Sequence, residues 1–402
     1  MKALQLTAEK FFELLNKKRT DPNFTSKIYE LVTYEDLPEP ALINDNWVKI
    51  KVKLGGICGT DINILEIKQS TYQLNFVSST AVPGHEIVGT ITEVGANVKD
   101  FLVGERVLVD EVLSCEVRGL ELCDACKEGD FSLCHNFDKG DLSPGFIMGL
   151  CEDTGGGWGE YVVAHKSQII KIPDSISFED ALISEPLAGA IHGVLKKKPK
   201  ENELAVVIGC GVMGLTTILA LKAFSNCKII AIDTRQSQID LAKKLGADDV
   251  FLANKNSFIR KVARKLGVRS ITPPLQDPTL VGGGADIVFD CVGIPSSLAS
   301  SLRLLKPKGN LILIGQPATL EIDWTPLFIK EIHLIASNTF GTEIIDGEKK
   351  RTLQIALDLI SSGQVDVSDF ITHKFSLDNY KEALEVASQK SKFNSIKVVF
   401  AF

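Results

Sequence analysis

The chain has 402 residues, of which 45% are hydrophobic and 24% are charged, and its formal net charge at pH 7 is −7. That length predicts two or three domains, each large enough to bury a core of its own. The net charge is negative, and no basic run is interleaved with aromatic residues. Both observations argue against a protein that binds nucleic acid.

Residues 1–19 contain no apolar run after the first basic residue, so we expect no secretory signal. Residues 204–221 are uncharged and long enough to resemble a membrane span. The glycines within them instead favour a buried strand, a tight turn and a buried helix. With nine cysteines and no signal, the protein is expected in the reducing cytosol, where clustered thiols bind metals more often than they pair.

The first part of the chain, residues 1–187, is rich in short β-branched runs that glycines and prolines punctuate. Examples are NWVKIKVKL at 46–54, EIVGTITEVG at 86–95 and ERVLVDEV at 105–112. This pattern predicts an irregular, mostly β domain.

The pattern changes after residue 187. Continuous apolar runs, which are typical of strands buried on both faces of a parallel sheet, alternate there with helical patterns. The runs are ELAVVIG at 203–209, CKIIAID at 227–233, ADIVFDCVG at 285–293 and GNLILIG at 309–315. We therefore predict a doubly wound α/β domain over residues 188–339, and residues 340–402 return to mixed structure and end in a strand.

The first of these apolar runs carries a predicted nucleotide site. Gly209, Gly211 and Gly214 have the G-x-G-x-x-G spacing between a strand and a helix, and Asp233 ends the next strand. Such glycines let the backbone approach a pyrophosphate, while the carboxylate accepts hydrogen bonds from the adenosine ribose. Asp233 would repel a 2′-phosphate, which favours NAD over NADP, although Arg235 softens that preference. The alternative is a glycine turn without a nucleotide. The predicted cofactor set also includes Val212, Met213, Cys291 and Gly315.

Four cysteines cluster in a short acidic stretch: Cys115, Cys123, Cys126 and Cys134. A C-x2-C pair places two sulfurs on the same side of a tight turn, and four thiolates can hold one tetrahedral zinc ion. Such a site has no open coordination position, so its metal would cross-link a lobe at about residues 112–137 and do no chemistry. The alternatives are disulfides, which the compartment disfavours, and an iron–sulfur cluster.

A second set of polar residues lies upstream, in GGICGTDINI and VPGHEIVG. Its members are Cys58, Thr60, Asp61, His85 and Glu86. Each has an ordinary structural interpretation, and no short spacing joins the cysteine to the histidine. The residues alone therefore only suggest a metal site.

Over nearly its whole length, the chain resembles the zinc-dependent medium-chain dehydrogenase/reductase family of alcohol, sorbitol, threonine and glucose dehydrogenases. The shared motifs follow the family's order: GICGTD, VPGHEIVG, VGERV, the cysteine lobe, EPLAGAIHG, VIGCGVMG, FDCVG and HKFSLDNYKEALE. The resemblance implies a GroES-like, mostly β catalytic domain built from residues 1–187 and 340–402. A Rossmann domain at 188–339 would lie between these segments.

The resemblance also implies the ligands of a catalytic zinc ion. Cys58 and His85 would bind it, and Glu86 would bind it or lie just beyond. Glu185, in SEPLA, fills the position where the polyol and sugar branches offer a glutamate rather than a cysteine. The cysteine lobe corresponds to the family's structural zinc site, so two zinc ions are expected per chain.

Two further roles follow from the same resemblance. Thr60 would take the proton from the alcohol, and Asp61 would hold the ring of His85. Asn63 stands where many members carry a histidine that ends the proton relay, so protons must leave by another route.

Other departures from the family pattern concern the lengths of segments. Seven residues separate Cys115 from Cys123 where the commoner number is two, which makes Cys115 the least certain lobe ligand. The stretch 7–40 and the loop at 270–284 are longer than usual, and the sequence assigns neither a function.

We predict a cytoplasmic zinc enzyme that transfers a hydride between an alcohol and NAD, with no nucleic-acid or membrane partner. Bound zinc would lower the pKa of the alcohol, and hydride would pass to the nicotinamide. Glu185 favours secondary alcohols, polyols or sugars, by analogy with the family. The alternatives are an L-threonine or amino-alcohol dehydrogenase and a non-catalytic NAD-binding zinc protein. A homo-oligomer, dimer or tetramer, is expected because Rossmann edge strands usually pair in this family.

Overall fold

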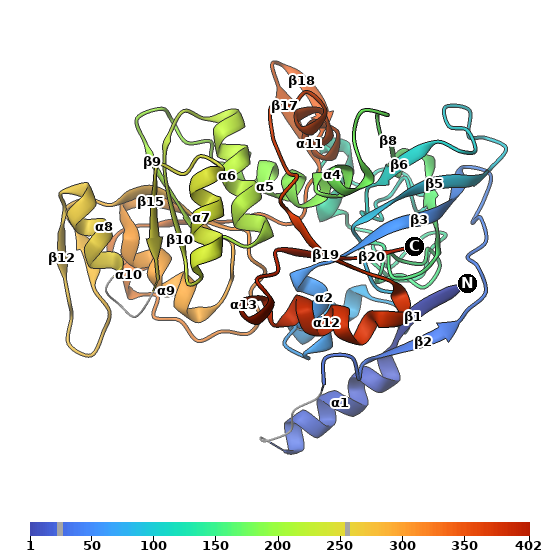
Figure 1. The fold of residues 1–402 in the computed structure, drawn as a ribbon, viewed down its shortest axis with the longest axis horizontal. Helices are drawn as coiled ribbons and strands as arrows, with labels where there is room; N and C mark the ends of the chain where they lie inside the picture. The colour runs from blue at the N-terminus through green and yellow to red at the C-terminus, as the bar shows by residue number, and fades with distance from the viewer. Residues whose placement is uncertain (22–26, 254–257) are drawn as a thin grey trace. The chain divides into compact units, whose positions relative to one another are not determined.

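The computed structural model describes residues 1–21, 27–253 and 258–402. These residues divide into two compact units (Figure 1). Unit 1 comprises Met1–Glu185 and Leu353–Phe402, and unit 2 comprises Pro186–Thr352. Each unit has its own main sheet and its own hydrophobic core.

A seven-stranded sheet is the framework of unit 1. Its order is β19-β20-β3-β5-β6-β8, and β7 also pairs with β3. Only the β19–β20 pair is parallel. The strands are β3 (Trp47–Ile57), β5 (Ile87–Val94), β6 (Arg106–Val109), β7 (Tyr161–His165), β8 (Ile169–Lys171), β19 (Ile371–Phe375) and β20 (Lys397–Ala401). Val48, Ile50 and Val52 are buried while Lys51 between them is exposed, so β3 follows the alternation expected of a half-buried strand. The mostly β, GroES-like fold expected for this part is confirmed.

A smaller sheet of unit 1, in the order β2-β1-β4, contains β1 (Lys2–Thr7), β2 (Val32–Asp36) and β4 (Thr80–Ala81). The α-helices of this unit are α1 (Ala8–Thr20), α2 (Gly59–Leu65), α3 (Asp124–Glu128), α4 (Phe178–Leu182), α12 (Tyr380–Ser388) and α13 (Lys390–Phe393). Its 3-10 helices are η1 (Thr71–Phe76), η2 (Phe131–Leu133), η3 (Lys166–Gln168) and η4 (Leu377–Asn379).

The long N-terminal stretch is folded into the core of unit 1. The hydroxyl of Thr7 accepts the N–H of Lys10 at 3.4 Å and caps α1. Phe11 and Leu14 of α1 are buried in the cluster that also contains Leu4 of β1. This stretch is therefore part of the packing of unit 1, although residues 22–26 within it lie outside the described residues.

A six-stranded parallel sheet is the framework of unit 2, in the order β11-β10-β9-β14-β15-β16. The strands are β9 (Leu204–Ile208), β10 (Lys228–Asp233), β11 (Asp249–Leu252), β14 (Ala285–Asp290), β15 (Leu305–Leu313) and β16 (His333–Ala336). The helices between them are α6 (Val212–Phe224), α7 (Gln236–Lys244), α8 (Phe258–Leu266), α9 (Pro295–Leu304) and α10 (Thr325–Ile329). The strand order reverses between β9 and β14, as in a doubly wound domain, so the predicted Rossmann fold is confirmed.

Two hairpins complete unit 2. The long loop at 270–284 forms the hairpin of β12 (Arg269–Ile271) and β13 (Thr279–Val281). The second hairpin joins β17 (Thr342–Ile345) and β18 (Glu348–Arg351).

Two helices, α5 (Ser184–Lys196) and α11 (Thr352–Ser361), contain the points where the chain passes from one unit to the other. The Nδ1 atom of His192 in α5 lies 2.5 Å from a carboxylate oxygen of Glu343 in β17. This contact joins the second hairpin to α5 within unit 2, and the second segment of unit 1 begins at Leu353. Among the described residues, no helix combines the length and the apolar character needed to cross a membrane.

Candidate metal and nucleotide sites

Three of the predicted metal ligands meet at one end of the main sheet of unit 1. Cys58 follows the last residue of β3, whereas His85 and Glu86 directly precede β5. The antiparallel register pairs Gly55 with Ile87, so the end of β3 and the start of β5 lie together. One donor atom of each of the three side chains lies within 4.8 Å of the other two. A thiolate, an imidazole and a carboxylate at this spacing suit zinc.

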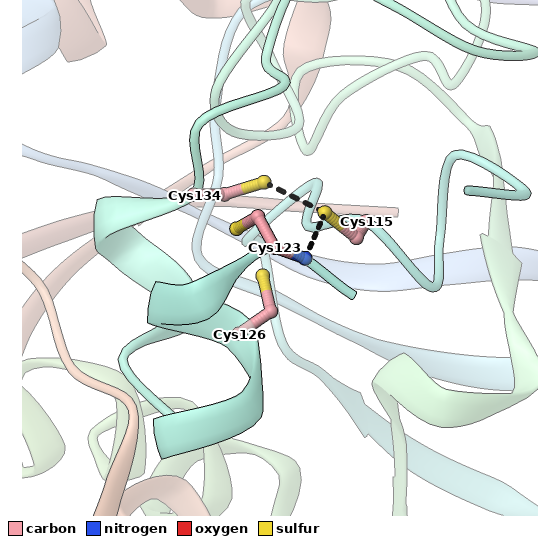
Figure 2. A group of neighbouring side chains, drawn as sticks. All are labelled: Cys115, Cys123, Cys126 and Cys134. Atoms are coloured by element: carbon pink, nitrogen blue, oxygen red, sulfur yellow. Dashed lines mark hydrogen bonds between the residues drawn. The ribbon is translucent and has the colours of Figure 1, made fainter. Parts of the chain in front are cut away.

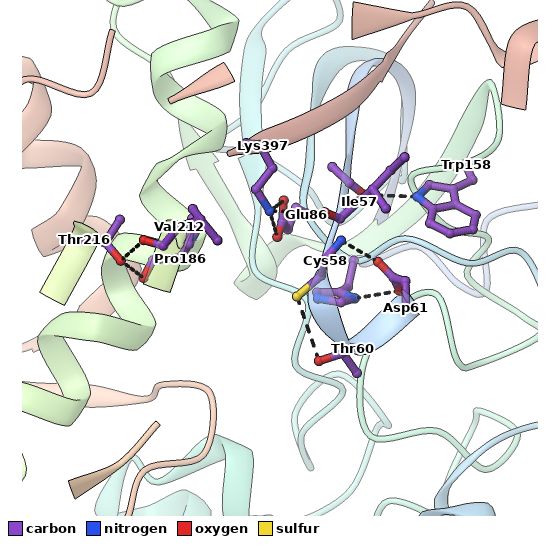
Figure 3. Close-up of polar contacts among 12 residues, drawn as sticks. Ile57, Cys58, Thr60, Asp61, Glu86, Trp158, Pro186, Val212, Thr216 and Lys397 are labelled. Atoms are coloured by element: carbon purple, nitrogen blue, oxygen red, sulfur yellow. Dashed lines mark hydrogen bonds and ion pairs between the residues drawn. The ribbon is translucent and has the colours of Figure 1, made fainter. Parts of the chain in front are cut away.

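Asp61 and Thr60 lie beside these donors (Figure 3). One carboxylate oxygen of Asp61 accepts the backbone N–H of Cys58 at 2.8 Å, and the other lies 3.6 Å from Nδ1 of His85. The hydroxyl of Thr60 is 3.8 Å from the sulfur of Cys58. Burial lowers the pKa of His85, but Asp61 and Cys58 outweigh burial and raise this pKa well above its usual value. Metal ions bind the deprotonated ring nitrogen, so a metal ion and a proton compete at His85.

Glu86 is already paired. The ammonium of Lys397, at the start of β20, contacts both carboxylate oxygens, and one of these distances is 2.6 Å. Both side chains are 1% exposed. Lys397 was not predicted from the sequence. The available signal was a single lysine in the otherwise apolar closing run IKVVFAF.

Glu185 is not part of the three-residue donor group. It lies in the first turn of α5, close enough to Glu111 for the two carboxyl groups to affect each other's pKa. Burial and the charge of Glu86 raise the pKa of Glu185 to about 7. Burial and the charge of Glu185 likewise raise the pKa of Glu111 well above its usual value. Glu111 was not predicted either, although the acidic pair Asp110–Glu111 directly follows an apolar run in the sequence.

The four lobe cysteines converge in a second cluster of unit 1 (Figure 2). Their sulfurs lie within 4.8 Å of one another. All nine cysteines are free thiols in the structure. Cys115 joins the other three, and its sulfur lies 3.4 Å from that of Cys134.

Hydrogen-bond donors surround these sulfurs. The Cys115 sulfur accepts the backbone N–H of Cys123 at 3.4 Å and an amide N–H of Asn136 at 3.2 Å. The backbone N–H of His135 donates to the sulfur of Cys123 at 3.4 Å. Burial raises the pKa of Cys123, but the N–H of His135 and further hydrogen bonds lower it to about 6. Burial instead raises the pKa of Cys126, and it raises that of Cys134 to about 11. Of these three cysteines, only Cys123 therefore favours the thiolate, the form that binds zinc.

The predicted nucleotide loop joins β9 to α6 in unit 2. Gly209 has φ +86, which favours glycine, and a Cβ on Gly214 would lie 1.7 Å from the carbonyl oxygen of Gly209. No side chain caps the N-terminus of α6, and a Cβ on Gly211 would meet no atom within 4 Å. The first-turn N–H groups, which include those of Val212 and Met213, suit a pyrophosphate.

Asp233 ends β10 beside this loop. One carboxylate oxygen accepts the N–H of Cys210 at 2.7 Å, and the other accepts the backbone N–H of Arg235 at 2.8 Å and its Nε–H at 3.3 Å. Cys291 and Gly315 follow the carboxyl ends of β14 and β15, so they belong to the same edge of the parallel sheet. The loop fits a dinucleotide, because backbone donors and a ribose-binding carboxylate adjoin one another.

Two family descriptions match consecutive parts of the chain. Residues 44–174 match the Alcohol dehydrogenase GroES-like domain, and residues 212–362 match the Zinc-binding dehydrogenase family. The chain belongs to the zinc-dependent medium-chain dehydrogenase/reductase family. As a member of this family, it is an oxidoreductase of the alcohol dehydrogenase type.

Several relatives of this dehydrogenase cover most of its length. It is 28% identical over 358 residues to L-idonate 5-dehydrogenase of Vitis vinifera, which covers 88% of this chain and 87% of the relative. It is 29% identical over 359 residues to sorbitol dehydrogenase of Bombyx mori, and the match covers 89% of this chain and 92% of the relative. The crystal structure of 2R,3R-butanediol dehydrogenase from Bacillus subtilis matches with a TM-score of 0.72 and 25% identity. The match covers 100% of this chain and 99% of that structure.

Proposed function

We propose that this dehydrogenase oxidises a secondary hydroxyl of a neutral polyol or sugar with NAD, and catalyses the reverse reduction. The observation that carries the proposal is the convergence of Cys58, His85 and Glu86 beside Thr60. The relatives that act on sorbitol and on butanediol support this substrate class.

Cys58 and His85 would hold the catalytic zinc ion, together with Glu185 or Glu86. Glu86 is the weaker candidate, because Lys397 already neutralises its carboxylate. Bound zinc supplies a Lewis acid that lowers the pKa of a ligated alcohol. Asp61 would orient His85, since its other oxygen is held by the backbone of Cys58.

Thr60 would accept the proton of the alcohol at its hydroxyl oxygen. Its contact with the sulfur of Cys58 supports this role, because a general base must lie within hydrogen-bond reach of a metal-bound oxygen.

The nucleotide would be NAD, which accepts the hydride when bound. Gly209, Gly211 and Gly214 would adjoin its pyrophosphate, and Asp233 would accept hydrogen bonds from the adenosine ribose. The carboxylate disfavours the 2′-phosphate of NADP, whereas Arg235 reduces that effect by neutralising Asp233.

The cysteine lobe would hold a second, structural zinc ion that cross-links its loop. We also propose a cytosolic location, which the free cysteines support. A dimer or tetramer is proposed because β16 is an edge strand with partly exposed apolar residues.

The acidic surroundings of the metal ligands disfavour the alternative of L-threonine, whose carboxylate needs a cation. Lys397, a cation beside the three donors, is already paired with Glu86. NADH formation should be measured with sorbitol, xylitol, 2,3-butanediol, L-threonine and ethanol, each with and without prior zinc removal. We expect turnover of a neutral polyol, and this turnover should be lost when zinc is removed. Turnover confined to L-threonine, or metal-independent turnover, would contradict the proposal.

A further inference from the structure

Asp290 lies where two loops meet at the carboxyl edge of the parallel sheet. It is the last residue of β14, and its neighbours across the sheet are Ile208 of β9 and Leu313 of β15. Its backbone carbonyl accepts the N–H groups of Ile314 and Gly315 at 3.0 and 2.9 Å. The strand order reverses between β9 and β14, and ligands of doubly wound domains bind at such a point.

The side chain of Asp290 holds the turn that follows β14. The residue is 0% exposed. Its Oδ1 atom accepts the backbone N–H groups of Val292 and Gly293 at 3.0 and 2.9 Å. The hydroxyl of Ser297 in α9 lies 3.0 Å from the same oxygen, and that of Ser301 lies 3.1 Å from Oδ2. A buried carboxylate is costly unless hydrogen bonds compensate, and two of these bonds fix the backbone of the turn.

This turn lies directly against the nucleotide loop. A Cβ on Gly209 would lie 2.2 Å from Cγ2 of Val292, so the valine side chain touches the loop between β9 and α6. A Cβ on Gly315 would lie 2.4 Å from the backbone nitrogen of Val292, and one on Gly293 would lie 2.5 Å from the carbonyl oxygen of Gly315. In contacts this close, the turn cannot shift without moving residues that are predicted to adjoin the cofactor.

We propose that Asp290 is a positioning residue of the nucleotide site, because it fixes the turn at Val292 and Gly293 as a wall beside the glycine loop. This inference rests on the proposed function, in which NAD binds at that loop. Asp290 contacts the turn and not the cofactor, so it acts by keeping the turn in one geometry. If the turn left that geometry for part of the time, the apparent affinity for the nucleotide would fall in proportion.

Two substitutions at position 290 separate the hydrogen bonds from the charge. Asp290→Asn keeps one acceptor oxygen, which can take the place of Oδ1. Its NH₂ group would then face the hydroxyl of Ser301, which can accept that bond and donate its own hydrogen to the carbonyl of Ser297 at 2.9 Å. Asp290→Ala removes both oxygens, so two backbone N–H groups of the turn lose their acceptor.

Asp286→Ala is the matched control on the same strand. Asp286 lies near the amino end of β14, and its carboxylate accepts the backbone N–H of Leu204 at 2.8 Å. Its removal also breaks a bond from a side chain to the backbone, but at the edge of the sheet opposite the nucleotide loop. Gly293→Ala tests the turn with the carboxylate in place, because φ +76 and the contact with Gly315 force an alanine there to move.

The readouts are the NADH affinity of the zinc-loaded protein, measured by fluorescence titration, and its melting temperature. Asp290→Ala and Gly293→Ala should each weaken NADH binding by about tenfold or more, as when the turn keeps its binding geometry for a tenth of the time. Asp290→Asn should stay within about threefold of wild type, since a neutral acceptor makes a weaker bond than a charged one. Asp286→Ala should lower the melting temperature and keep the wild-type affinity.

Wild-type NADH affinity in folded Asp290→Ala would overturn the proposal, and so would wild-type affinity in Gly293→Ala, which tests the turn even where Asp290→Ala does not fold. Equal losses of affinity in Asp290→Ala and Asp286→Ala would also overturn it, since affinity would then follow stability. Equal losses in the two Asp290 variants would do the same, because the charge would then matter and not the acceptor. Failure of the proposed function has a different signature: the wild type itself would bind neither NADH nor NADPH.

Discussion

The ammonium of Lys397 and the carboxylate of Glu86 form an ion pair in which each side chain is 1% exposed. Two residues 311 positions apart in the chain thus neutralise each other beside the metal donors. Burial lowers the pKa of Lys397, but Glu86 and Cys58 outweigh burial and raise it. The lysine is therefore a permanent counter-ion.

Removing this lysine should be strongly destabilising. Lys397→Met leaves an unpaired buried carboxylate and should lower the free energy of unfolding by about 3–5 kcal/mol, measured by urea denaturation of the zinc-loaded protein. The double variant Lys397→Met/Glu86→Gln should recover most of that loss, since no unpaired charge remains. Lys171→Met is the control: Lys171 pairs with Glu105 at 2.8 Å but is 52% exposed, so about 1 kcal/mol or less is expected. Equal effects of the two lysine substitutions would contradict this account.

The cysteine lobe should bind one zinc ion whose loss loosens the fold. Cys126→Ser is expected to reduce the zinc content from two ions to one and to lower the melting temperature, because a ligand and its cross-link are lost. Elemental analysis and calorimetry would measure both. Cys227→Ser, a buried cysteine of unit 2, should keep two zinc ions. Unchanged zinc in Cys126→Ser, or a lobe disulfide found by mass spectrometry, would exclude the proposed site.

Cofactor preference should depend on the charge of Asp233. Asp233→Asn keeps one acceptor oxygen, for the N–H of either Cys210 or Arg235, and removes the charge that repels a 2′-phosphate. The ratio of kcat/KM for NAD to that for NADP should fall by about tenfold, equivalent to ~1.4 kcal/mol. Arg235→Gln should shift the ratio in the opposite direction, because the carboxylate loses its partner. A wild type that prefers NADP would refute this interpretation.

Thr60 should be needed for proton transfer and not for metal binding. Thr60→Val is expected to lower kcat by about 10²–10⁴-fold with its zinc content intact, whereas Thr60→Ser should retain most activity because it keeps the hydroxyl. Steady-state kinetics and metal analysis would test both, and NADH-binding fluorescence should be the same in both variants. A Thr60→Val variant as fast as wild type would remove Thr60 from the mechanism.

Local sequence patterns were enough to predict the mostly β domain, the doubly wound α/β domain and the four-cysteine cluster. The β9–α6 glycine loop and the lobe are contiguous, so spacing alone specified their geometry. Lys397 and Glu111 were not predicted, because their positions depend on strand register. Pairing of β20 with β3 and of β6 with β5 brings them to the metal donors, and no motif encodes those pairings. Lys397 also resembles an ordinary strand lysine until its neighbours are known.

The position of Lys397 in the last strand affects the order of assembly during synthesis. Cys58, His85 and Glu86 are translated early, but β20 can pair with β3 only after the chain is almost complete. Until then, the carboxylate of Glu86 lacks its counter-ion, and burying it is unfavourable. The metal-binding end of unit 1 should therefore mature late, after the intervening nucleotide-binding unit has emerged from the ribosome. A nascent chain lacking only its final strand would leave this acidic group exposed to water.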